Sequence, residues 1–353
     1  MLAIPGRLAP DILLNSDVGH GVKVVGADPV RDWHDRIGTT RIGSTPCPGA
    51  LRRLPSQGVR SERTNRREYR LYRAVQALGR AMPFWMLQKI GAVLGVVFLL
   101  ASSRRRTVMR NLARVYPGRS ALSHFGVALR CAAHFGRITF DFIKWSHAPA
   151  ETIRRKVSCE GQENIAEAVR RGKGCFVLSA HFGHWEVAAQ WLAVSGFPQG
   201  MVYRPLENPL VEEELARTRT RFGNTLIPKE GAPRGIMRTI RRGGLVDILL
   251  DQKADLEHSV IVTFLNVATP TTPSLAKIVL ATGAAVVPLF SYPDGTGYSF
   301  RLDPPVPVEP GDTVTTLTQR YNDAVSREIF AHPHLWFWFH DRWTPRKRRS
   351  TGL

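Results

Sequence analysis

The chain has 353 residues, 43% hydrophobic and 22% charged, a composition that excludes wholesale disorder and is long enough to bury a sizeable core. Its four cysteines are widely spaced with no CxxC pair, which makes a disulfide scaffold and a zinc ribbon both unexpected. The net charge of +20 predicts a polyanionic partner: nucleic acid, an anionic membrane surface, or an acidic protein or substrate.

The positive charge is concentrated in one central segment. Residues 67–156 carry 17 basic and three acidic side chains, whereas residues 157–353 carry 22 basic and 20 acidic ones. We therefore expect a basic binding surface that is separate from a nearly neutral chemical domain.

The N-terminal extension, residues 1–60, holds eight glycines and six prolines and shows no sustained periodicity. Such a composition predicts an irregular or disordered segment. Asp11 and Asp17 flank its short apolar run and no long hydrophobic stretch follows, so we do not expect a secretory signal.

Helical patterns begin near Ser61 and include the apolar segment 82–101, which has a single charge, Lys89. Its length could just span a bilayer, but the uninterrupted apolar stretch, 90–101, would also suit a buried core helix. Six arginines lie on each side, and this tie favours a monotopic or re-entrant anchor on one anionic leaflet. We assign 61–120 as a basic, membrane-anchoring helical region, and whether 82–101 spans or lies on the membrane stays open.

An amphipathic helix is predicted over 121–156, and after it helices alternate with strands. The expected strands are 175–180, 201–203, 225–227, 245–250, 260–264, 285–290, 298–302 and 335–339. The expected helices are 164–171, 186–194, 210–221, 235–242, 274–281 and 315–330. This order predicts an α/β fold with a mixed central sheet flanked by helices over 121–346, followed by a basic tail, 347–353.

The most specific local pattern is Leu178-Ser-Ala-His181-Phe-Gly-His184-Trp-Glu186, where a buried strand ends and a helix begins. A histidine at such a strand end could be a general base, and Glu186 in the first helical turn could hold its tautomer. A capping histidine with a first-turn glutamate is the structural alternative. His181 and His184 could also be metal ligands, but HExxH is absent and no third ligand is evident, so we expect no metal.

Polar residues also follow other predicted strands: Arg204, Asp251 with Gln252, and Arg342. Each alone could be an ordinary loop charge, but together at one sheet edge they are typical of a binding site. GxGxxG, the P-loop and GxSxG are absent, which argues against nucleotide enzymes and serine hydrolases.

The pattern His181-x4-Glu186 resembles the signature of the bacterial lipid A late acyltransferase family of the lauroyl and myristoyl type. The resemblance runs over about 67–346, and supporting motifs follow in order. They are Tyr203-Arg204-Pro205-Leu206-x-Asn208-Pro209, Leu226-Ile227-Pro228, Arg242-Gly243-Gly244, Asp251-Gln252, Thr271-Thr272, Thr282-Gly-Ala-Ala-Val-Val-Pro288 and Leu335-Trp336-x-Trp338-x-His340-x-Arg342-Trp343.

The resemblance implies a glycerolipid acyltransferase-like fold and acyl transfer from an acyl-acyl carrier protein to a hydroxyl of a phosphorylated glycolipid, a lipid A precursor. It places the enzyme at the anionic leaflet of the bacterial inner membrane, with the catalytic domain facing the cytoplasm. His181 would be the base and Glu186 its partner, with Arg204 and Asp251 at further functional positions. It implies no covalent intermediate and no cofactor.

Three departures and three alternatives accompany this resemblance, and the first departure is that residues 1–60 have no recognised counterpart in the family. His184 stands where the family usually has a small polar residue such as Asn, and Gln88-Lys89 interrupts the anchor. The acceptor could instead be another membrane lipid, such as an ornithine lipid or a glycosylated phosphatidylinositol. A nucleic-acid-binding protein would use the basic runs 104–106 and 346–349, but no nucleic-acid motif accompanies them. The intact His181/Glu186 pair argues against a catalytically dead lipid-binding module.

Overall fold

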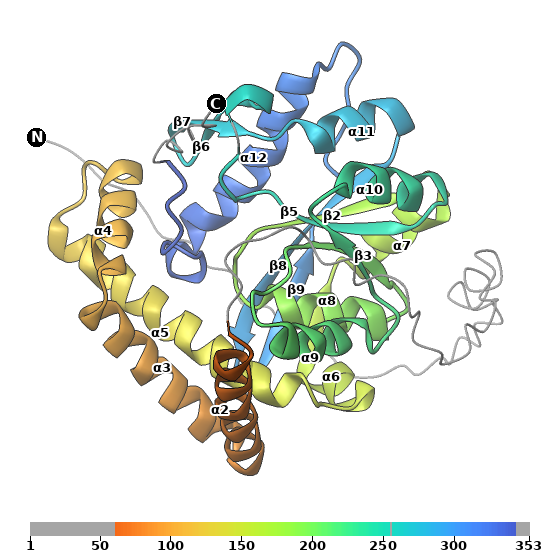
Figure 1. The fold of residues 1–353 in the computed structure, drawn as a ribbon. Coiled ribbons are helices and arrows are strands. Elements are labelled where there is room, and N and C mark those ends of the chain that lie inside the picture. Colours follow the sequence, from red (N-terminus) through yellow and green to blue (C-terminus); the bar gives the residue numbers. More distant parts are fainter. Residues whose placement is uncertain (1–60, 255, 344–353) are drawn as a thin grey trace, which may run out of the picture. The chain divides into compact units, whose positions relative to one another are not determined.

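The computed structural model describes residues 61–254 and 256–343, which lie within one compact unit, 53–353. The expectations for the extension 1–60 and the tail 347–353 lie outside the described residues. Within the described part, the predicted mixed α/β architecture is confirmed (Figure 1).

Among the described residues, five helices precede the sheet: α2 (Glu62–Ala81), α3 (Phe84–Ala101), α4 (Arg104–Val115), α5 (Ala121–Trp145) and α6 (Ala150–Lys156). Two prolines make the boundaries differ from the predicted ones. Pro83 and Pro149 adopt extended backbone with ψ of 149° and 155°, and each caps a new helix. A proline has no backbone N–H to donate, so it is tolerated at a helix start and ends the helix before it.

Helices α3 and α5 pack tightly along each other (Figure 1). A Cβ added at Gly95 would lie 2.1 Å from the Ala132 carbonyl oxygen, and one at Gly136 would lie 2.1 Å from the Gly91 carbonyl oxygen. Only glycine permits so close a backbone approach, and Gly91-x3-Gly95 is the spacing that brings membrane helices together.

Much of the surface of α3 that α5 does not cover is exposed. Its exposed apolar face consists of Trp85, Val93, Leu94, Val97, Phe98 and Leu100. Helix α3 is also the one described helix long and apolar enough to cross a membrane, with a mean hydropathy of 1.9 over 18 residues.

The central sheet has seven strands in the order β1-β9-β8-β2-β5-β3-β4. They are β1 (Val157–Glu160), β2 (Cys175–Ser179), β3 (Gln199–Tyr203), β4 (Thr225–Pro228), β5 (Leu245–Leu249), β8 (Ala285–Asp294) and β9 (Gly297–Leu302). All neighbours are parallel except β8 and β9, which form an antiparallel pair. The central strand β2 is buried along its whole length, which is why its sequence is a continuous apolar run.

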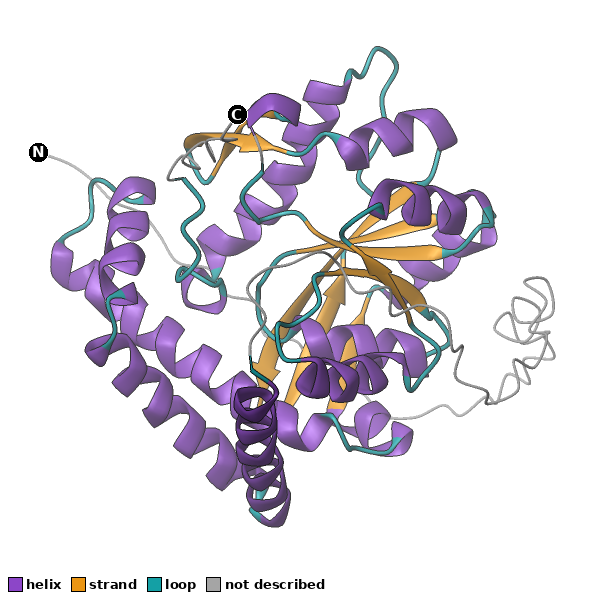
Figure 2. Ribbon diagram, in the orientation of Figure 1, coloured by secondary structure: helices purple, strands orange, loops and turns teal. Residues whose placement is uncertain are grey.

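Helices flank this sheet (Figure 2). They are α7 (Gln162–Arg170), α8 (Trp185–Val194), α9 (Pro209–Thr220), α10 (Ala232–Arg241), α11 (Ser274–Thr282) and α12 (Val314–Ala331). A separate hairpin, β6 (Val260–Phe264) and β7 (Val267–Thr271), packs on α12. Its two turn residues, Leu265 and Asn266, both have positive φ, as a tight two-residue hairpin turn requires.

The predicted final strand, 335–339, is wrong. A 3-10 turn, Pro333–Leu335, leads into Trp336, which forms an isolated bridge with Phe182, and the chain turns again after it. Gly183 N donates to Leu335 O at 2.9 Å, and Phe337 N donates to His181 O at 3.0 Å. The aromatic segment therefore packs against the residues that follow β2 instead of adding to the sheet.

Candidate active site

The register of two central strands brings His181 and Asp251 together. Strands β2 and β5 are parallel, with Ser179 opposite Leu249, and Leu250 N continues the pairing by donating to Ser179 O at 3.1 Å. His181 and Asp251 are each two residues beyond that paired position. Their side chains therefore meet at the carboxyl edge of the sheet, where open α/β folds bind ligands.

The carboxylate of Asp251 holds the imidazole of His181. Asp251 Oδ1 lies 2.9 Å from His181 Nδ1, and Oδ2 accepts from the His181 backbone N at 2.9 Å and from Trp336 Nε1 at 2.7 Å. An ionised carboxylate can only accept, so Nδ1 carries the proton and Nε2 is left with its lone pair. The Gln252 amide nitrogen donates to that Nε2 at 3.2 Å.

This pairing shifts the pKa of both groups. Burial works to lower the pKa of His181, but the charge of Asp251 and its hydrogen bond outweigh burial and raise it. Burial works to raise the pKa of Asp251, but His181 and the donors around the carboxylate lower it to about 2. The His181 side chain keeps 19% of its surface exposed, whereas that of Asp251 keeps 3%. The pair is thus a fixed carboxylate beneath an accessible base.

The expected contact between Glu186 and His181 is not the one that forms. Glu186 lies in the first turn of α8 and forms a two-pronged ion pair with Arg219 of α9, in which Arg219 Nε donates to Oε2 at 3.1 Å. Asp251, which arrives from the neighbouring strand, takes the place at Nδ1 instead. Glu186 still acts on the base at longer range, since its negative charge adds to the rise in the pKa of His181.

Two further ionisable residues, Arg219 and Asp247, lie near the centre, and neither was expected there from the sequence. Arg219 is one of several arginines in and after α9, and nothing in its spacing marks it. Asp247 lies on β5, where burial and the nearby charge of Glu186 raise its pKa to about 7. A single acidic residue in an otherwise apolar strand was the available signal for Asp247.

The other expected binding residues have different locations. Gln252 reaches His181, as described. Arg204 follows β3 and is exposed, and within the described residues no hydrogen bond or ion pair joins its guanidinium to His181. Arg342 is buried, at 1% exposed, and donates to Pro270 O at 3.0 Å and Thr271 Oγ1 at 3.1 Å. Arg342 therefore supports the β6–β7 hairpin and is not placed on an open substrate surface.

His184 faces a second, separate aspartate. Its Nε2 lies 3.2 Å from Asp141 Oδ1, and both side chains are almost fully buried. Asp141 Oδ2 accepts from the Tyr298 hydroxyl at 2.6 Å and from the Gln88 amide at 2.9 Å. Because His181 and His184 face different carboxylates, they do not converge on a common metal position. The unusual Gln88 of the anchor segment is explained by this contact, which ties α3 to α5.

Comparisons with known proteins indicate the family of the chain. The model of the family described as bacterial lipid A biosynthesis acyltransferase matches residues 60–345. A phosphatidylinositol mannoside acyltransferase of Mycolicibacterium smegmatis is 26% identical over 77% of this chain and 90% of that protein. A lipid A biosynthesis acyltransferase of Haemophilus influenzae is 23% identical, over 73% of this chain and 81% of its own length. The Escherichia coli lipid A biosynthesis myristoyltransferase is 25% identical, over 68% and 75%.

Among solved structures, the 1-acyl-sn-glycerophosphate acyltransferase PlsC of Thermotoga maritima aligns with a TM-score of 0.34 and 14% identity, over 69% of this chain and 98% of that one. The family is shown instead by the family model, whose matched range, residues 60–345, covers most of the sequence. The chain belongs to the bacterial lipid A biosynthesis acyltransferase family and is an acyltransferase.

Proposed function

We propose that the protein transfers a fatty acyl group from an acyl-acyl carrier protein thioester to a hydroxyl of a lipid A precursor, with His181 as general base. The observation that supports this role is the His181–Asp251 pair. Its buried carboxylate fixes the proton on Nδ1, and its exposed side presents the Nε2 lone pair. A base held in this tautomer can accept a hydroxyl proton without first reorganising.

The proposed reaction is a direct transfer. Nε2 of His181 removes the proton of the acceptor hydroxyl, the oxygen attacks the thioester carbonyl, and the carbon–sulfur bond breaks. The imidazolium then returns the proton to the departing thiolate. Within the described residues, the imidazole is hydrogen-bonded to a carboxylate and an amide and not to a hydroxyl or thiol, which supports direct attack without an acyl-enzyme. Asp251 acts as a positioning residue.

Gln252 must give way for this chemistry. Its amide donates to the same Nε2 that would accept the substrate proton. The side chain is exposed and its loop directly follows β5, so the substrate hydroxyl can replace the amide as hydrogen-bond donor. In the free enzyme, the Gln252 amide therefore occupies the position that the acceptor hydroxyl takes when the substrate binds.

We also propose that the enzyme lies on the anionic cytoplasmic leaflet of the bacterial inner membrane without crossing it. The exposed apolar face of α3 would enter the leaflet while the exposed arginines at the start of α4, Arg104 to Arg106, contact lipid phosphates. The other face of α3 is covered by α5, which carries the buried Asp141 and cannot itself enter a bilayer. A helix packed in this way is part of the catalytic domain.

A phosphatidylinositol mannoside is the second candidate acceptor. The observation favouring it is the Mycolicibacterium smegmatis relative, which aligns over 90% of its own length. Both candidates are phosphorylated glycolipids, so the same base and the same basic surface would serve either one.

The test is an acyl-transfer assay with purified protein in mixed micelles, using labelled acyl-acyl carrier protein and either acceptor. We expect a labelled product from the lipid A precursor, and a His181→Ala turnover lower by about 10³-fold or more, as for loss of a positioned general base. His258→Ala, which changes an exposed histidine in the 3-10 turn Leu256–His258, is the matched control. If only the phosphatidylinositol mannoside gives product, it is the acceptor in place of the lipid A precursor. An active His181→Ala enzyme would overturn the mechanism.

A further inference from the structure

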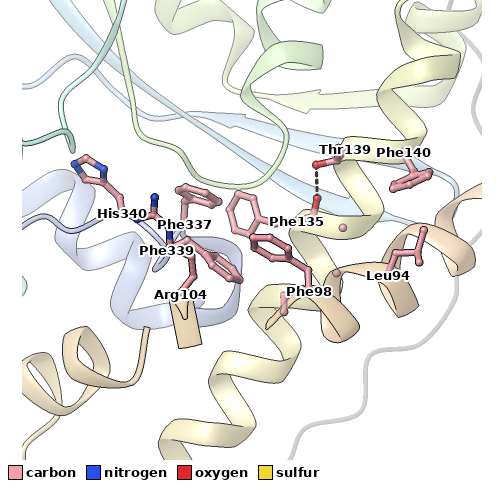
Figure 3. Close-up of a pocket in the computed structure, with 12 residues that line it drawn as sticks. Leu94, Phe98, Arg104, Phe135, Thr139, Phe140, Phe337, Phe339 and His340 are labelled. Atoms are coloured by element: carbon pink, nitrogen blue, oxygen red, sulfur yellow. Dashed lines mark hydrogen bonds between the residues drawn. The ribbon is translucent and has the colours of Figure 1, made fainter. Parts of the chain in front are cut away.

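A cavity of about 440 Å³ lies between α3, α5 and the aromatic segment that follows the 3-10 turn Pro333–Leu335 (Figure 3). Part of its lining is small: Gly95, Ala132 and Gly136, the residues that let α3 and α5 approach. The rest is mainly aromatic, and its volume falls in the range usual for small-molecule sites. The cavity is therefore suited to an apolar, flexible ligand.

One end of this cavity adjoins the catalytic centre. Phe337 lines the cavity, and its ring centroid lies 6.5 Å from that of His181. His340 also lines it and accepts a hydrogen bond from Lys253 N at 3.2 Å, next to Gln252. A chain in the cavity would consequently end beside the base.

The other end opens toward the exposed apolar face of α3. Leu94 and Phe98 line the cavity and are nevertheless 44% and 54% exposed to solvent. Figure 3 shows Leu94 at the end of the cavity opposite His340. The interior of the cavity is thus continuous with the surface that we propose enters the leaflet.

A positive charge stands at the side of the cavity nearer the catalytic centre. Arg104, at the start of α4, lines the cavity close to Phe339 (Figure 3). Over the ranges 61–254 and 256–343, its guanidinium has no hydrogen bond or ion pair. A guanidinium that has no carboxylate partner and lies beside an apolar wall can bind a phosphate or another anionic group of a lipid headgroup.

We propose that this cavity binds one acyl chain of the membrane-lipid acceptor, with the headgroup phosphate at Arg104 and the reacting hydroxyl at His181. The lipid would enter sideways from the leaflet past Leu94 and Phe98. This inference rests on the proposed function and names the subsite of its acceptor. The open outer end favours an acyl chain of the acceptor over that of the donor. A membrane lipid can place one chain in the cavity while its other chains stay in the bilayer. The donor is carried in water and has no chains in the bilayer.

The first test narrows the outer end of the cavity. Leu94→Trp adds bulk to a lining residue, and Val93→Trp makes the same kind of change at the next position, which is 62% exposed and does not line the cavity. With the acceptor that the wild-type enzyme acylates, we expect Leu94→Trp to raise the acceptor KM about tenfold with kcat nearly unchanged, as for loss of uniform binding. Val93→Trp keeps the membrane-facing surface apolar and adds the same bulk outside the cavity, so we expect it to raise the acceptor KM much less than Leu94→Trp does.

A second test removes the positive charge of Arg104. Arg104→Gln should raise the KM of the phosphorylated acceptor about tenfold, as for loss of one charge-assisted contact. Its matched control is Arg105→Gln, at a neighbouring exposed arginine outside the cavity lining. A dephosphorylated acceptor should abolish the difference between these two variants, which separates a specific phosphate contact from general attraction to the membrane.

Three outcomes would overturn the subsite. Equal kinetics for Leu94→Trp and Val93→Trp would show that the cavity is not used. A rise in the donor KM, or a shift in preferred donor chain length at an unchanged acceptor KM, would assign the cavity to the donor. Equal effects at Arg104 and Arg105 would reject the phosphate contact. All three outcomes require that the wild-type enzyme transfers acyl groups. If it does not, the result counts against the proposed function and not against the subsite.

Discussion

Two histidines only three residues apart each face an aspartate, and the two pairs differ in burial. His181 lies 2.9 Å from Asp251 and keeps 19% of its side chain exposed, whereas His184 lies 3.2 Å from Asp141 and keeps 3%. The first pair offers a free nitrogen at the edge of the sheet. The second is enclosed by Phe142 and Tyr298 and binds α3, α5 and β9 together.

Proximity of an imidazole and a carboxylate therefore does not by itself indicate catalysis. The two pairs differ in whether the imidazole nitrogen that does not face the aspartate is accessible to a substrate. Breaking each pair should therefore produce different kinds of defect, one in turnover and one in stability.

The largest expected effect comes from Asp251→Asn. An amide can offer its NH₂ group to Nδ1 and so favour the wrong tautomer, and we expect kcat to fall about 10³-fold while the protein stays folded. Turnover in the acyl-transfer assay, together with circular dichroism, checks this. A variant within about threefold of wild-type turnover would show that Asp251 does not position the base.

The equivalent change in the buried pair, Asp141→Asn, should act on stability. Asp141 accepts from Tyr298 and Gln88 with no exposure to water, so we expect a loss of about 3 kcal/mol in the free energy of unfolding. Denaturant unfolding measures this loss, with Asp294→Asn at the exposed end of β8 as control. Turnover per folded molecule should change little, and a large drop in it would make the two pairs functionally alike.

Glu186→Gln should have a smaller effect on turnover. The substitution removes the charge that pairs with Arg219 and that helps to raise the pKa of His181. We expect kcat to fall about tenfold, in keeping with one lost electrostatic contact at a catalytic centre. Glu213→Gln, whose carboxylate forms an exposed ion pair with Arg217 on α9, is the matched control. A fall in kcat as large as that expected for Asp251→Asn would show that Glu186, and not Asp251 alone, orients the His181 imidazole.

The smallest expected effect is a shift of the pH profile. His181 must be unprotonated to act as a base, so kcat/KM should rise as pH rises through its raised pKa. Neutralising Glu186 should move this acidic limb to lower pH, because a negative neighbour is removed. An unchanged limb in Glu186→Gln would show that the titrating group is not His181.

The same shifts set the pH dependence of stability. The raised folded-state pKa of His181 contributes stability below its unfolded value of about 6.5, and this is lost as pH rises through the folded pKa. The depressed pKa of Asp251 contributes stability above its unfolded value of about 3.9, and this is lost as pH falls toward about 2.

The elements after residue 157 could largely be predicted because buried strands such as 175–179 form continuous apolar runs that end at glycines or polar residues. The site could be predicted only in part. His181 was identifiable from the end of its strand, but its partner comes from a strand 70 residues later. Local spacing favoured Glu186, and only the parallel pairing of β2 with β5 places Asp251 opposite. Arg342 shows the reverse case, since its position after an expected strand suggested an open site while the fold buries it.

The close approach of α3 and α5 has a consequence during synthesis. Helix α3 ends at Ala101 and α5 at Trp145, so at 5–20 residues per second α3 leaves the ribosome roughly 2–9 seconds before its partner is complete. Throughout that interval both its glycine face and its apolar face are unpaired. If the apolar face enters a leaflet as proposed, it is therefore free to do so before the catalytic domain has folded. Translation in vitro with liposomes added during or after synthesis would test this, and equal yields of active enzyme from the two would contradict it.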